Sequence, residues 1–383
     1  MNSKDIKFLV NVFLSWRVLL FVFLFLSIGT YALQMNFLGG GLTSYLKAPY
    51  LWSWINFDGE HYLAIAYRGY QPLTYFYFPL FPLITKFAGL TLGRSYTSLA
   101  ISGLLVSNIS LILALVGFWK LVLMDYKKGI AKVAIILLLL FPTSFYFGSF
   151  YTESTFLMLA VWSFYFARKK SWFLAGILGA FSTATRIVGL ALVPALLLEA
   201  WLQKRKEERF NLLPAAFGIL LVPLGLFLYM YFLKLTTGDA LEFLHSVTIF
   251  GQQRSSSLIL LPQVFYRYIF KILPNLNYDY FPVVFTTFLE FLVASVFSVL
   301  SVLSFFRLRL SYAVYLALGY LIPTFSGSFS SLPRYTLVLF PAFMLLSIYL
   351  SKAPRALQVI SYSLLFICLA IATALFVRGY WVA

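Results

Sequence analysis

Acidic residues are scarce in this chain: 12 of 383 residues are Asp or Glu, against 29 Lys and Arg. Hydrophobic residues make up 62%, and the mean hydropathy is +0.90. No water-soluble domain buries such a fraction of apolar side chains, so the composition predicts a polytopic membrane protein. The single cysteine, Cys368, lies in an apolar run, which excludes a disulfide framework and a Cys-based metal site.

Several catalytic signatures are also missing. The sequence has no Walker loop, no HExxH and no GxSxG motif, so ATP-driven work, metalloprotease chemistry and serine-hydrolase chemistry have no support. The net charge of +17 does not indicate nucleic-acid binding, because the basic residues form short clusters between apolar runs. Such clusters are the orientation signal of membrane proteins.

Apolar runs divide the chain. They cover approximately residues 8–33, 97–123, 130–149, 152–168, 171–202, 212–234, 281–305, 311–325, 335–351 and 355–377. If the basic clusters between them are cytoplasmic, the run 171–202 must begin and end on the same side. This predicts a re-entrant hairpin of two short helices that turns at 185–189. Each arm of about 15 residues is roughly 22 Å long, short of the roughly 30 Å hydrocarbon core.

The predicted fold is therefore all-α, a single transmembrane domain over residues 1–383 with about 11 transmembrane helices. The run 8–33 is too long for a signal-peptide core, and we interpret it as a retained first helix. With the N-terminus inside, the two long loops, 34–96 and 235–280, face outward. The aromatic and proline-rich first loop is expected to hold interfacial helices. A protein with its sizeable loops on one face is expected to work there.

The first outer loop holds the most informative stretch, WINFDGEHYLAIAYRGY over residues 54–70. Asp58 and Glu60 lie two apart, next to His61 and Tyr62 in an aromatic frame. An acidic pair at a membrane face has an energetic cost, so its presence indicates a functional role. A carboxylate half-sheltered by aromatic rings suits a general base, because partial desolvation keeps its pKa from falling too low. The alternative for Asp58 is a helix N-cap.

Three further charges are expected on the same face. Glu153 follows a proline and a glycine in PTSFYFGSFYTES and is either functional or an acid favoured by a helix N-terminus. Arg186, at the tip of the hairpin, either pairs with a carboxylate such as Glu153 or binds an anion. Arg334, in SGSFSSLPRY, is either a second anion ligand or a snorkelling arginine. Two converging arginines suit a phosphate, which they hold by forked hydrogen bonds. His245 and the run 252–254 are weaker candidates for acceptor contacts.

These segments resemble a known family. A DxE-type acidic motif in the first outer loop is the hallmark of the GT-C glycosyltransferases, and the finer pattern is similar to the PIG-V type, the GPI mannosyltransferase 2 family. The matching pieces are FDGEHYLAIAYRGY, YFPLFPL, the block from FPTSFYFGSFYTES to FSTATRIVGLAL, and SLPRYTLVLFPAF. They run in family order over about residues 52–343. The chain departs from the family in having Phe57 where a tryptophan is expected, and Arg-Ile-Val-Gly where relatives often have Arg-Pro-Thr-Gly.

The resemblance implies a GT-C-type fold and an inverting transfer of mannose from a polyprenyl- or dolichyl-phosphate donor to a lipid-linked or extracytoplasmic glycan. Asp58 would be the base, and the other candidate substrate-binding residues are Glu60, His61, Tyr62, Glu153, Arg186, Arg334 and Tyr335. We expect no cofactor and no required metal, since arginines can replace a metal ion at a monophosphate. The protein would lie in the plasma membrane of a prokaryote or the endoplasmic reticulum of a eukaryote, with its site on the extracytoplasmic face. The rival hypothesis is a lipid-linked sugar flippase or transporter.

Overall fold

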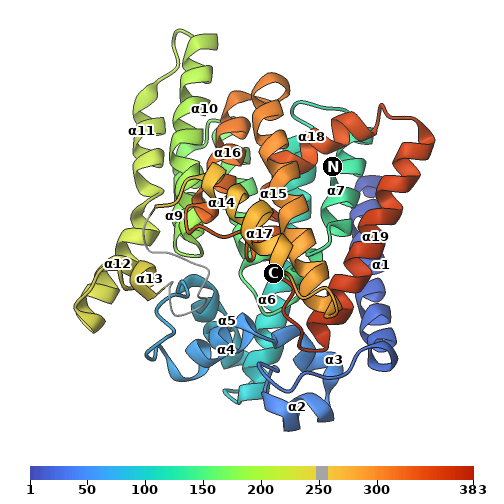
Figure 1. The fold of residues 1–383 in the computed structure, drawn as a ribbon. Helices are drawn as coiled ribbons and strands as arrows, with labels where there is room; N and C mark the ends of the chain where they lie inside the picture. Colours follow the sequence, from blue (N-terminus) through green and yellow to red (C-terminus); the bar gives the residue numbers. More distant parts are fainter. Residues whose placement is uncertain (247–257) are drawn as a thin grey trace.

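The computed structural model describes residues 1–246 and 258–383 as a bundle of helices, and these two ranges contain no β-strand (Figure 1). Within them, six helices are long and apolar enough to cross a membrane: Ser3–Thr30, Tyr96–Val122, Ile187–Lys206, Leu212–Thr237, Phe281–Arg307 and Arg355–Val377. Shorter apolar helices accompany them at Leu80–Leu92, Trp172–Thr183, Leu310–Thr324 and Phe340–Leu350. The prediction of an all-α integral membrane protein is confirmed.

The helices follow the chain in a regular order. The first half contains α1 (Ser3–Thr30), α2 (Gly41–Lys47), α3 (Pro49–Trp52), η1 (Ser53–Ile55), α4 (Asp58–Arg68), α5 (Leu80–Leu92), α6 (Tyr96–Val122), α7 (Lys128–Leu140), η2 (Ser144–Gly148), α8 (Glu153–Arg168), α9 (Trp172–Thr183) and η3 (Ile187–Ala191). The second half contains α10 (Leu192–Lys206), α11 (Leu212–Leu221), α12 (Leu224–Thr237), α13 (Glu242–His245), α14 (Leu261–Arg267), η5 (Tyr268–Ile272), η6 (Leu273–Asn275), α15 (Phe281–Arg307), α16 (Leu310–Thr324), α17 (Leu332–Thr336), α18 (Phe340–Leu350) and α19 (Arg355–Val377).

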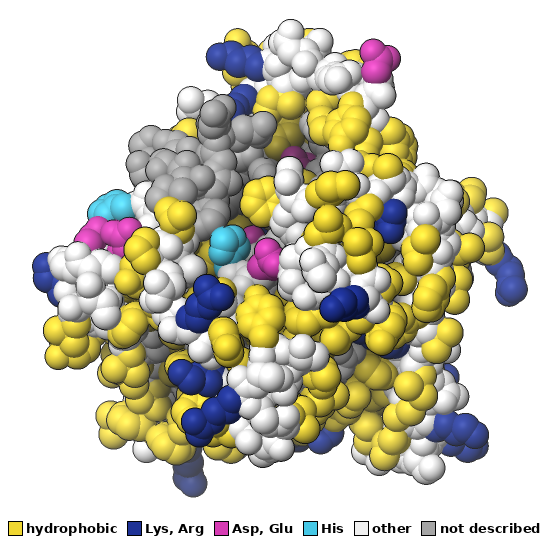
Figure 2. Space-filling view, turned by 90° about the horizontal axis from the view of Figure 1, so that it is seen from below, with side chains coloured by type: hydrophobic (Ala, Val, Ile, Leu, Met, Phe, Trp, Pro, Cys, Tyr) yellow, Lys and Arg dark blue, Asp and Glu magenta, His cyan; other side chains and the backbone are white. Residues whose placement is uncertain are grey.

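The two ends of the bundle differ in what they carry. The connections α6–α7, α10–α11, α15–α16 and α18–α19 hold most of the basic clusters, and we call this the basic end (Figure 1). The opposite end carries the short helices α2 to α5, and we call it the cavity end. Figure 2 views the cavity end, where histidine and acidic side chains lie near the centre and Lys and Arg side chains are spread around them.

A network of ion pairs and hydrogen bonds joins the helices at the basic end. Glu199 of α10 is fully buried and receives Arg309 in a fork, from Nε at 2.6 Å and from Nη2 at 2.8 Å. The Ser311 hydroxyl donates to the same carboxylate at 2.8 Å. Arg168 of α8 lies 3.6 Å from it and forms a second fork with Asp125 at 2.7 and 2.8 Å. The network therefore joins the α6–α7 turn, α8, α10 and α16.

Two helix breaks shape the bundle beside the site. The chain breaks at 184–186 between α9 and η3, close to the turn predicted at 185–189. The run 212–234 is not one regular helix, because Pro223 separates α11 from α12 and has no backbone N–H to continue the ladder. α11 packs closely on α9, where a Cβ on Gly176 would lie 2.2 Å from the Gly218 carbonyl oxygen. Side chains larger than hydrogen are therefore excluded from this crossing.

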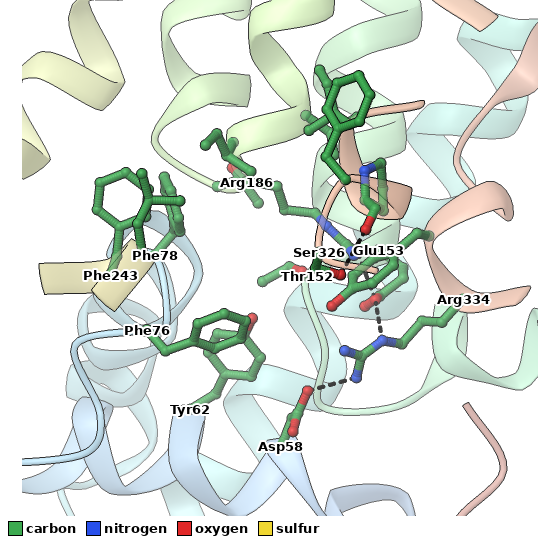
Figure 3. A pocket seen from close by; sticks show the side chains of 18 of the residues that line it. Asp58, Tyr62, Phe76, Phe78, Thr152, Glu153, Arg186, Phe243, Ser326 and Arg334 are labelled. Atoms are coloured by element: carbon green, nitrogen blue, oxygen red, sulfur yellow. Dashed lines mark hydrogen bonds and ion pairs between the residues drawn. The ribbon is translucent and has the colours of Figure 1, made fainter. Parts of the chain in front are cut away.

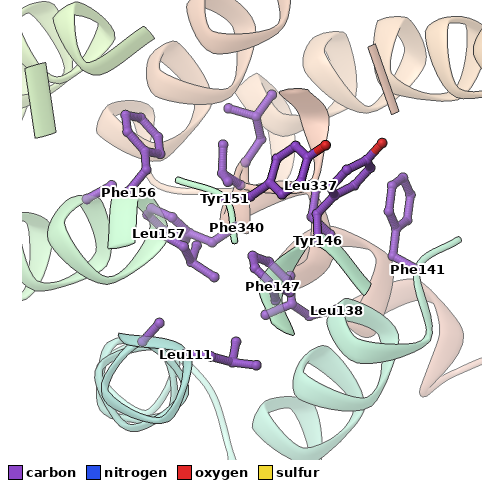
Figure 4. Packing of buried hydrophobic residues seen from close by; sticks show 14 of the residues in the cluster. Leu111, Leu138, Phe141, Tyr146, Phe147, Tyr151, Phe156, Leu157, Leu337 and Phe340 are labelled. Carbon is purple, nitrogen blue, oxygen red and sulfur yellow. The ribbon is translucent and has the colours of Figure 1, made fainter. Parts of the chain in front are cut away.

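Behind the site lies a dense apolar core from α6, α7, η2, α8 and the segment 337–343 (Figure 4). Two buried tyrosines at its edge satisfy their hydroxyls outside the core. Tyr146 donates to the Ala383 carbonyl at 2.8 Å, and Tyr151 donates to the Asn56 carbonyl at 2.7 Å. Buried hydroxyls need such partners. The core thereby fixes the backbone just before the acidic motif.

Candidate active site

Asp58 is the first residue of α4, and the residue in the N-cap position is Phe57, which has a positive φ of 57°. The helix-cap interpretation of Asp58 is wrong, because Phe57 occupies the N-cap position and Asp58 is already inside the helix. Instead, Asp58 Oδ2 accepts from Arg334 Nη1 at 2.6 Å and Oδ1 accepts from the Tyr77 hydroxyl at 3.1 Å. A positive φ in a bulky residue is strained. The backbone is thus held in an unfavourable conformation at the residue that aims Asp58.

Arg334 is the centre of the site. It is 5% exposed and lies on α17, three residues after Ser331, another non-glycine residue with positive φ (64°). Besides Asp58, its guanidinium faces Glu153, with Nε 3.5 Å from Oε1. Aromatic rings surround it at 5.4 to 5.5 Å from their centroids, those of Tyr146, Tyr151 and Tyr335. A guanidinium suits such a cage, because it stacks on aromatic rings while its edge donates hydrogen bonds.

Arg186 lies at the break before η3, and its Nη1 donates to Glu153 Oε1 at 2.6 Å. Its guanidinium lies 4.9 Å from the ring centroid of Tyr335, which therefore contacts both arginines. Glu153 therefore pairs with Arg186, which is one of the two alternatives that the sequence offered for this arginine, and Asp58 pairs with Arg334. The four side chains form an alternating, electrically neutral row, Asp58, Arg334, Glu153 and Arg186.

The charges of the site also set the pKa values of the acidic motif. Burial raises the pKa of Asp58, but the Arg334 charge and hydrogen bond, with His61 and Tyr77, outweigh it and bring the pKa below its ordinary value. Asp58 is therefore ionised. Burial lowers the pKa of His61, which favours a neutral imidazole. Burial raises the pKa of Glu60 against the backbone amides of Gly41 and Gly40.

Two cavities meet at this row of charges. The smaller one, about 310 Å³, is shown in Figure 3 with Asp58, Glu153, Arg186 and Arg334 on its wall. The rest of its lining is largely apolar or hydroxylated: Tyr62, Phe76, Phe78, Thr152, Thr185, Ile187, Val188, Phe243, Leu244, Leu258, Ile322, Pro323, Phe325, Ser326 and Tyr335. This cavity therefore has charged side chains on one part of its wall and mainly apolar side chains on the rest.

The larger cavity, about 1060 Å³, shares Asp58, Phe76, Arg334 and Tyr335 with the smaller one. Its other lining residues are more polar: Gln34, Asn36, Phe37, Phe57, His61, Tyr77, Tyr268, Ile272, Tyr280, Pro282, Val283, Thr286, Thr287, Glu290, Ser330, Ser331, Gly379, Tyr380 and Trp381. The Asp58–Arg334 pair thus stands in the wall between two chambers of different character.

The structure brings together most of the residues predicted from the sequence. Asp58, His61, Tyr62, Glu153, Arg186, Arg334 and Tyr335 all line one cavity or both. Glu60 lines neither; its carboxylate is held by the amides of the turn at Gly40 and Gly41. The run 252–254 lies outside the described residues. Across 1–246 and 258–383, no cluster of three or more His, Cys, Asp or Glu side chains is placed to hold a metal ion.

Sequence reasoning missed two residues that support Asp58. Tyr77 donates to its carboxylate and stacks on His61, with ring centroids 5.0 Å apart. Asn56 is fully buried and bridges the Gly39 amide and the Phe376 carbonyl, both at 2.9 Å. Both were within reach: Tyr77 lies in the aromatic run YFYFPLFPL, and Asn56 stands two residues before Asp58. Neither has a chemical signal that separates it from its neighbours.

Comparisons with known proteins show the family and the fold to which the chain is similar. The family model described as "Mannosyltransferase (PIG-V)" matches residues 6–203, and no curated protein matches the sequence. The structure of ArnT from Cupriavidus metallidurans bound to undecaprenyl phosphate is similar, with a TM-score of 0.53 and 15% identity; the alignment covers 100% of this chain and 77% of that one. The oligosaccharyltransferase of Archaeoglobus fulgidus has a TM-score of 0.49 at 11% identity, covering 98% of this chain and 56% of its own. The chain therefore spans only about half of that enzyme.

We predict that Glu153→Gln destabilises the protein, because Arg186 then keeps its buried charge without a counter-charge. Breaking a buried ion pair in this way lowers the free energy of unfolding by about 3–5 kcal/mol. The measurement is thermal melting of the purified protein in detergent. The matched control is Glu207→Gln, which breaks the half-exposed pair with Lys170 (48% and 49% exposed) and should change stability by less than about 1 kcal/mol. Equal melting shifts for the two variants would contradict the importance of the buried row.

Proposed function

Because the chain belongs to the PIG-V family of mannosyltransferases, within the GT-C glycosyltransferases, we propose that it moves a mannose from a polyprenyl-phosphate carrier to a hydroxyl of an extracytoplasmic glycan or glycolipid. The observation that carries the proposal is the Asp58–Arg334 ion pair at the wall shared by two cavities. The lining of the smaller cavity is complementary to a lipid phosphate, and the lining of the larger cavity is complementary to a polar acceptor. The transfer takes place between them.

The smaller cavity suits the donor. A polyprenyl phosphate has one anionic group and a long apolar chain, and this cavity pairs two arginines with an apolar wall that includes Phe78 and Phe325. Arginine forks bind phosphate oxygens in a bidentate way. The similar ArnT structure is described as bound to undecaprenyl phosphate, a ligand of this chemistry. In the proposed complex, Arg186 and Arg334 bind the donor phosphate and neutralise it as it leaves.

Asp58 is the proposed base. It reaches the larger cavity, where the acceptor hydroxyl would lie, and its pKa is below the ordinary value because Arg334 is its partner. A donor phosphate competes for the same guanidinium and weakens the Asp58–Arg334 bond. The pKa of Asp58 then rises, so donor binding makes Asp58 a stronger base. Since acceptor and phosphate occupy different cavities, attack opposite the phosphate is favoured, which inverts the anomeric carbon.

The proposed membrane arrangement keeps the cavity end outside and the basic end in the cytoplasm. It retains eleven transmembrane helices by counting α9 and the η3–α10 segment as the two arms of a re-entrant hairpin, although Ile187–Lys206 is by length and composition able to cross a membrane. α9 has 12 residues, about 18 Å at 1.5 Å per residue, and is too short to cross the hydrocarbon core. The break at 184–186 then delivers Arg186 to the donor cavity from the cytoplasmic side of the bundle.

The function is tested by giving purified protein polyprenyl-phosphate-mannose or its hexose isomers and following which sugar leaves the lipid. We expect release of mannose, and we expect Asp58→Asn to lose about 10²- to 10⁴-fold in rate while still binding donor, because the general base is gone. The control is Asp279→Asn, an exposed acid at the cavity end, which should retain activity. Near-normal turnover by a folded Asp58→Asn protein would remove Asp58 from the chemistry.

We predict that Arg186→Gln and Arg334→Gln each weaken donor binding about ten-fold or more. A charged hydrogen bond contributes about 1.5–3 kcal/mol, and about 1.4 kcal/mol is one decade in affinity. Lys should restore binding only in part, because it lacks the fork. The measurement is equilibrium binding of polyprenyl-phosphate-mannose, with the exposed Arg94→Gln as control. Parent-like affinity in both variants would move the phosphate site elsewhere.

The same Arg334→Gln variant has a pH signature. Asp58 must be ionised to act as base, and Arg334 holds its pKa below the ordinary value. Without Arg334 the carboxylate takes up its proton at higher pH, so the acid limb of the rate profile should move upward. A limb that does not move would mean that Asp58 is not the titrating group.

We also predict that both ends of the hairpin face the cytoplasm. Single cysteines at Lys170 and Lys204, in a Cys368→Ser background, should be labelled by an impermeant thiol reagent only from the cytoplasmic side. Asp279→Cys, at the cavity end, provides the control for the other side. Labelling of positions 170 and 204 from opposite sides would overturn the hairpin and the topology that follows it.

A further inference from the structure

The last residues of the described chain turn back into the bundle after α19 instead of leaving it. Gly379 makes the turn with a φ of 80°, and a Cβ there would lie 2.9 Å from the Gln34 carbonyl oxygen. The Trp381 carbonyl accepts from the Thr286 hydroxyl at 3.1 Å, and the Ala383 carbonyl accepts from Tyr146 at 2.8 Å. These bonds fix the segment Gly379–Ala383 against α15 and the core.

Trp381 is the exception in this anchored segment. Its neighbour Val382 is fully buried, yet Trp381 is 41% exposed. The indole packs edge-on against Phe57, with ring centroids 5.4 Å apart, and lines the larger cavity. Phe57 immediately precedes Asp58. A large aromatic side chain therefore packs on the residue that precedes the proposed base and presents part of its surface to the larger cavity.

The rest of the cavity wall supplies groups that bond hydroxyls. Thr286, Thr287 and Ser330 contribute hydroxyl groups, and Glu290, 6% exposed, contributes a buried carboxylate that accepts from Tyr268 at 2.9 Å. Hydroxyls and carboxylates bond ligand hydroxyls well, and an aromatic face suits the apolar C–H face of a sugar ring. The cavity, at about 1060 Å³, has the size of a site for a sizeable small ligand.

We infer that Trp381 is the stacking platform for the sugar ring of the acceptor in the larger cavity. This inference rests on the proposed function, which it deepens by naming a residue that positions the acceptor. The ring lies with its C–H face on the indole, its hydroxyls bond the hydroxyls of Thr287 and Ser330, and one hydroxyl points to Asp58. A site that bonds ligand hydroxyls discriminates strongly against molecules that lack them.

The test measures binding directly, so that it does not depend on turnover. Full-length protein in nanodiscs is titrated with methyl α-mannopyranoside, methyl β-glucopyranoside, myo-inositol and a Ser/Thr-containing peptide, by ligand-observed NMR. We expect at least one polyol to bind, and Trp381→Ala to weaken it ten-fold or more with donor affinity unchanged. Trp381→Phe should restore part of the loss. Thr287→Val, which leaves the Gly379–Ala383 segment untouched, should weaken the same ligand by a smaller factor. The control is Trp201→Ala, a 49% exposed tryptophan on α10.

Unchanged polyol affinity in Trp381→Ala, or binding of the peptide and of no polyol, would overturn the inference. A parallel loss of donor affinity and melting temperature in Trp381→Ala, with no selective effect in Thr287→Val, would also overturn it, since Trp381 would then be structural. Failure of the proposed function looks different: the parent would bind the polyol but release no mannose from polyprenyl-phosphate-mannose.

Discussion

The guanidinium of Arg334 holds this site together. It is buried among three tyrosine rings, and a charge placed there is tolerated only if it is paired. Asp58 pairs with it from α4, and Glu153 faces it from α8 while it pairs with Arg186 from the α9–η3 break. Segments up to 276 residues apart in the chain are thus joined by one row of charges. Removing any member leaves another charge buried without its partner.

This neutrality also limits how the proposed phosphate ligand can bind. The row balances two positive and two negative charges, so an incoming phosphate must compete with carboxylates already in place. The competition favours ligands that have both an anionic group for the two arginines and an apolar chain for the apolar wall of the smaller cavity. It also links the two cavities, because whatever occupies Arg334 from one side changes the ionisation of Asp58 on the other.

Much of the site could be predicted because acidic and basic residues are rare in so apolar a chain. Asp58, Glu153, Arg186 and Arg334 stood out for that reason, and all four line the smaller cavity. The Arg186–Glu153 pair was one of two alternatives for Arg186, but the Asp58–Arg334 pair was not predicted, because 276 residues separate its members in the sequence. Glu60 was grouped with Asp58 by spacing, but the residues of one helical turn point in different directions, and Glu60 faces the turn at Gly40.

In the fold, too, some features could be predicted from the sequence and others could not. Apolar runs and basic clusters gave the helical class and the break before η3, because both depend on local composition. The break at Pro223 was overlooked inside a run that is apolar on both sides of it. Nothing in the local sequence predicted that the segment Gly379–Ala383 folds back and packs against Phe57. Its position depends on hydrogen bonds to Thr286 and Tyr146, which only the folded chain brings near.

The ionic network around Glu199 has a consequence for how molecules pass through the bundle. Moving a ligand from one membrane face to the other would require the basic end to open, which would separate Glu199 from Arg309 and Arg168 from Asp125. Separating the fully buried Glu199 from Arg309 would leave an uncompensated charge, at a cost of about 3–5 kcal/mol. Among the described residues, the row from Asp58 to Arg186 lines two cavities that are separate from the Glu199 network. The basic end is therefore expected to stay closed, and in the proposed reaction substrates and products would enter and leave at the cavity end.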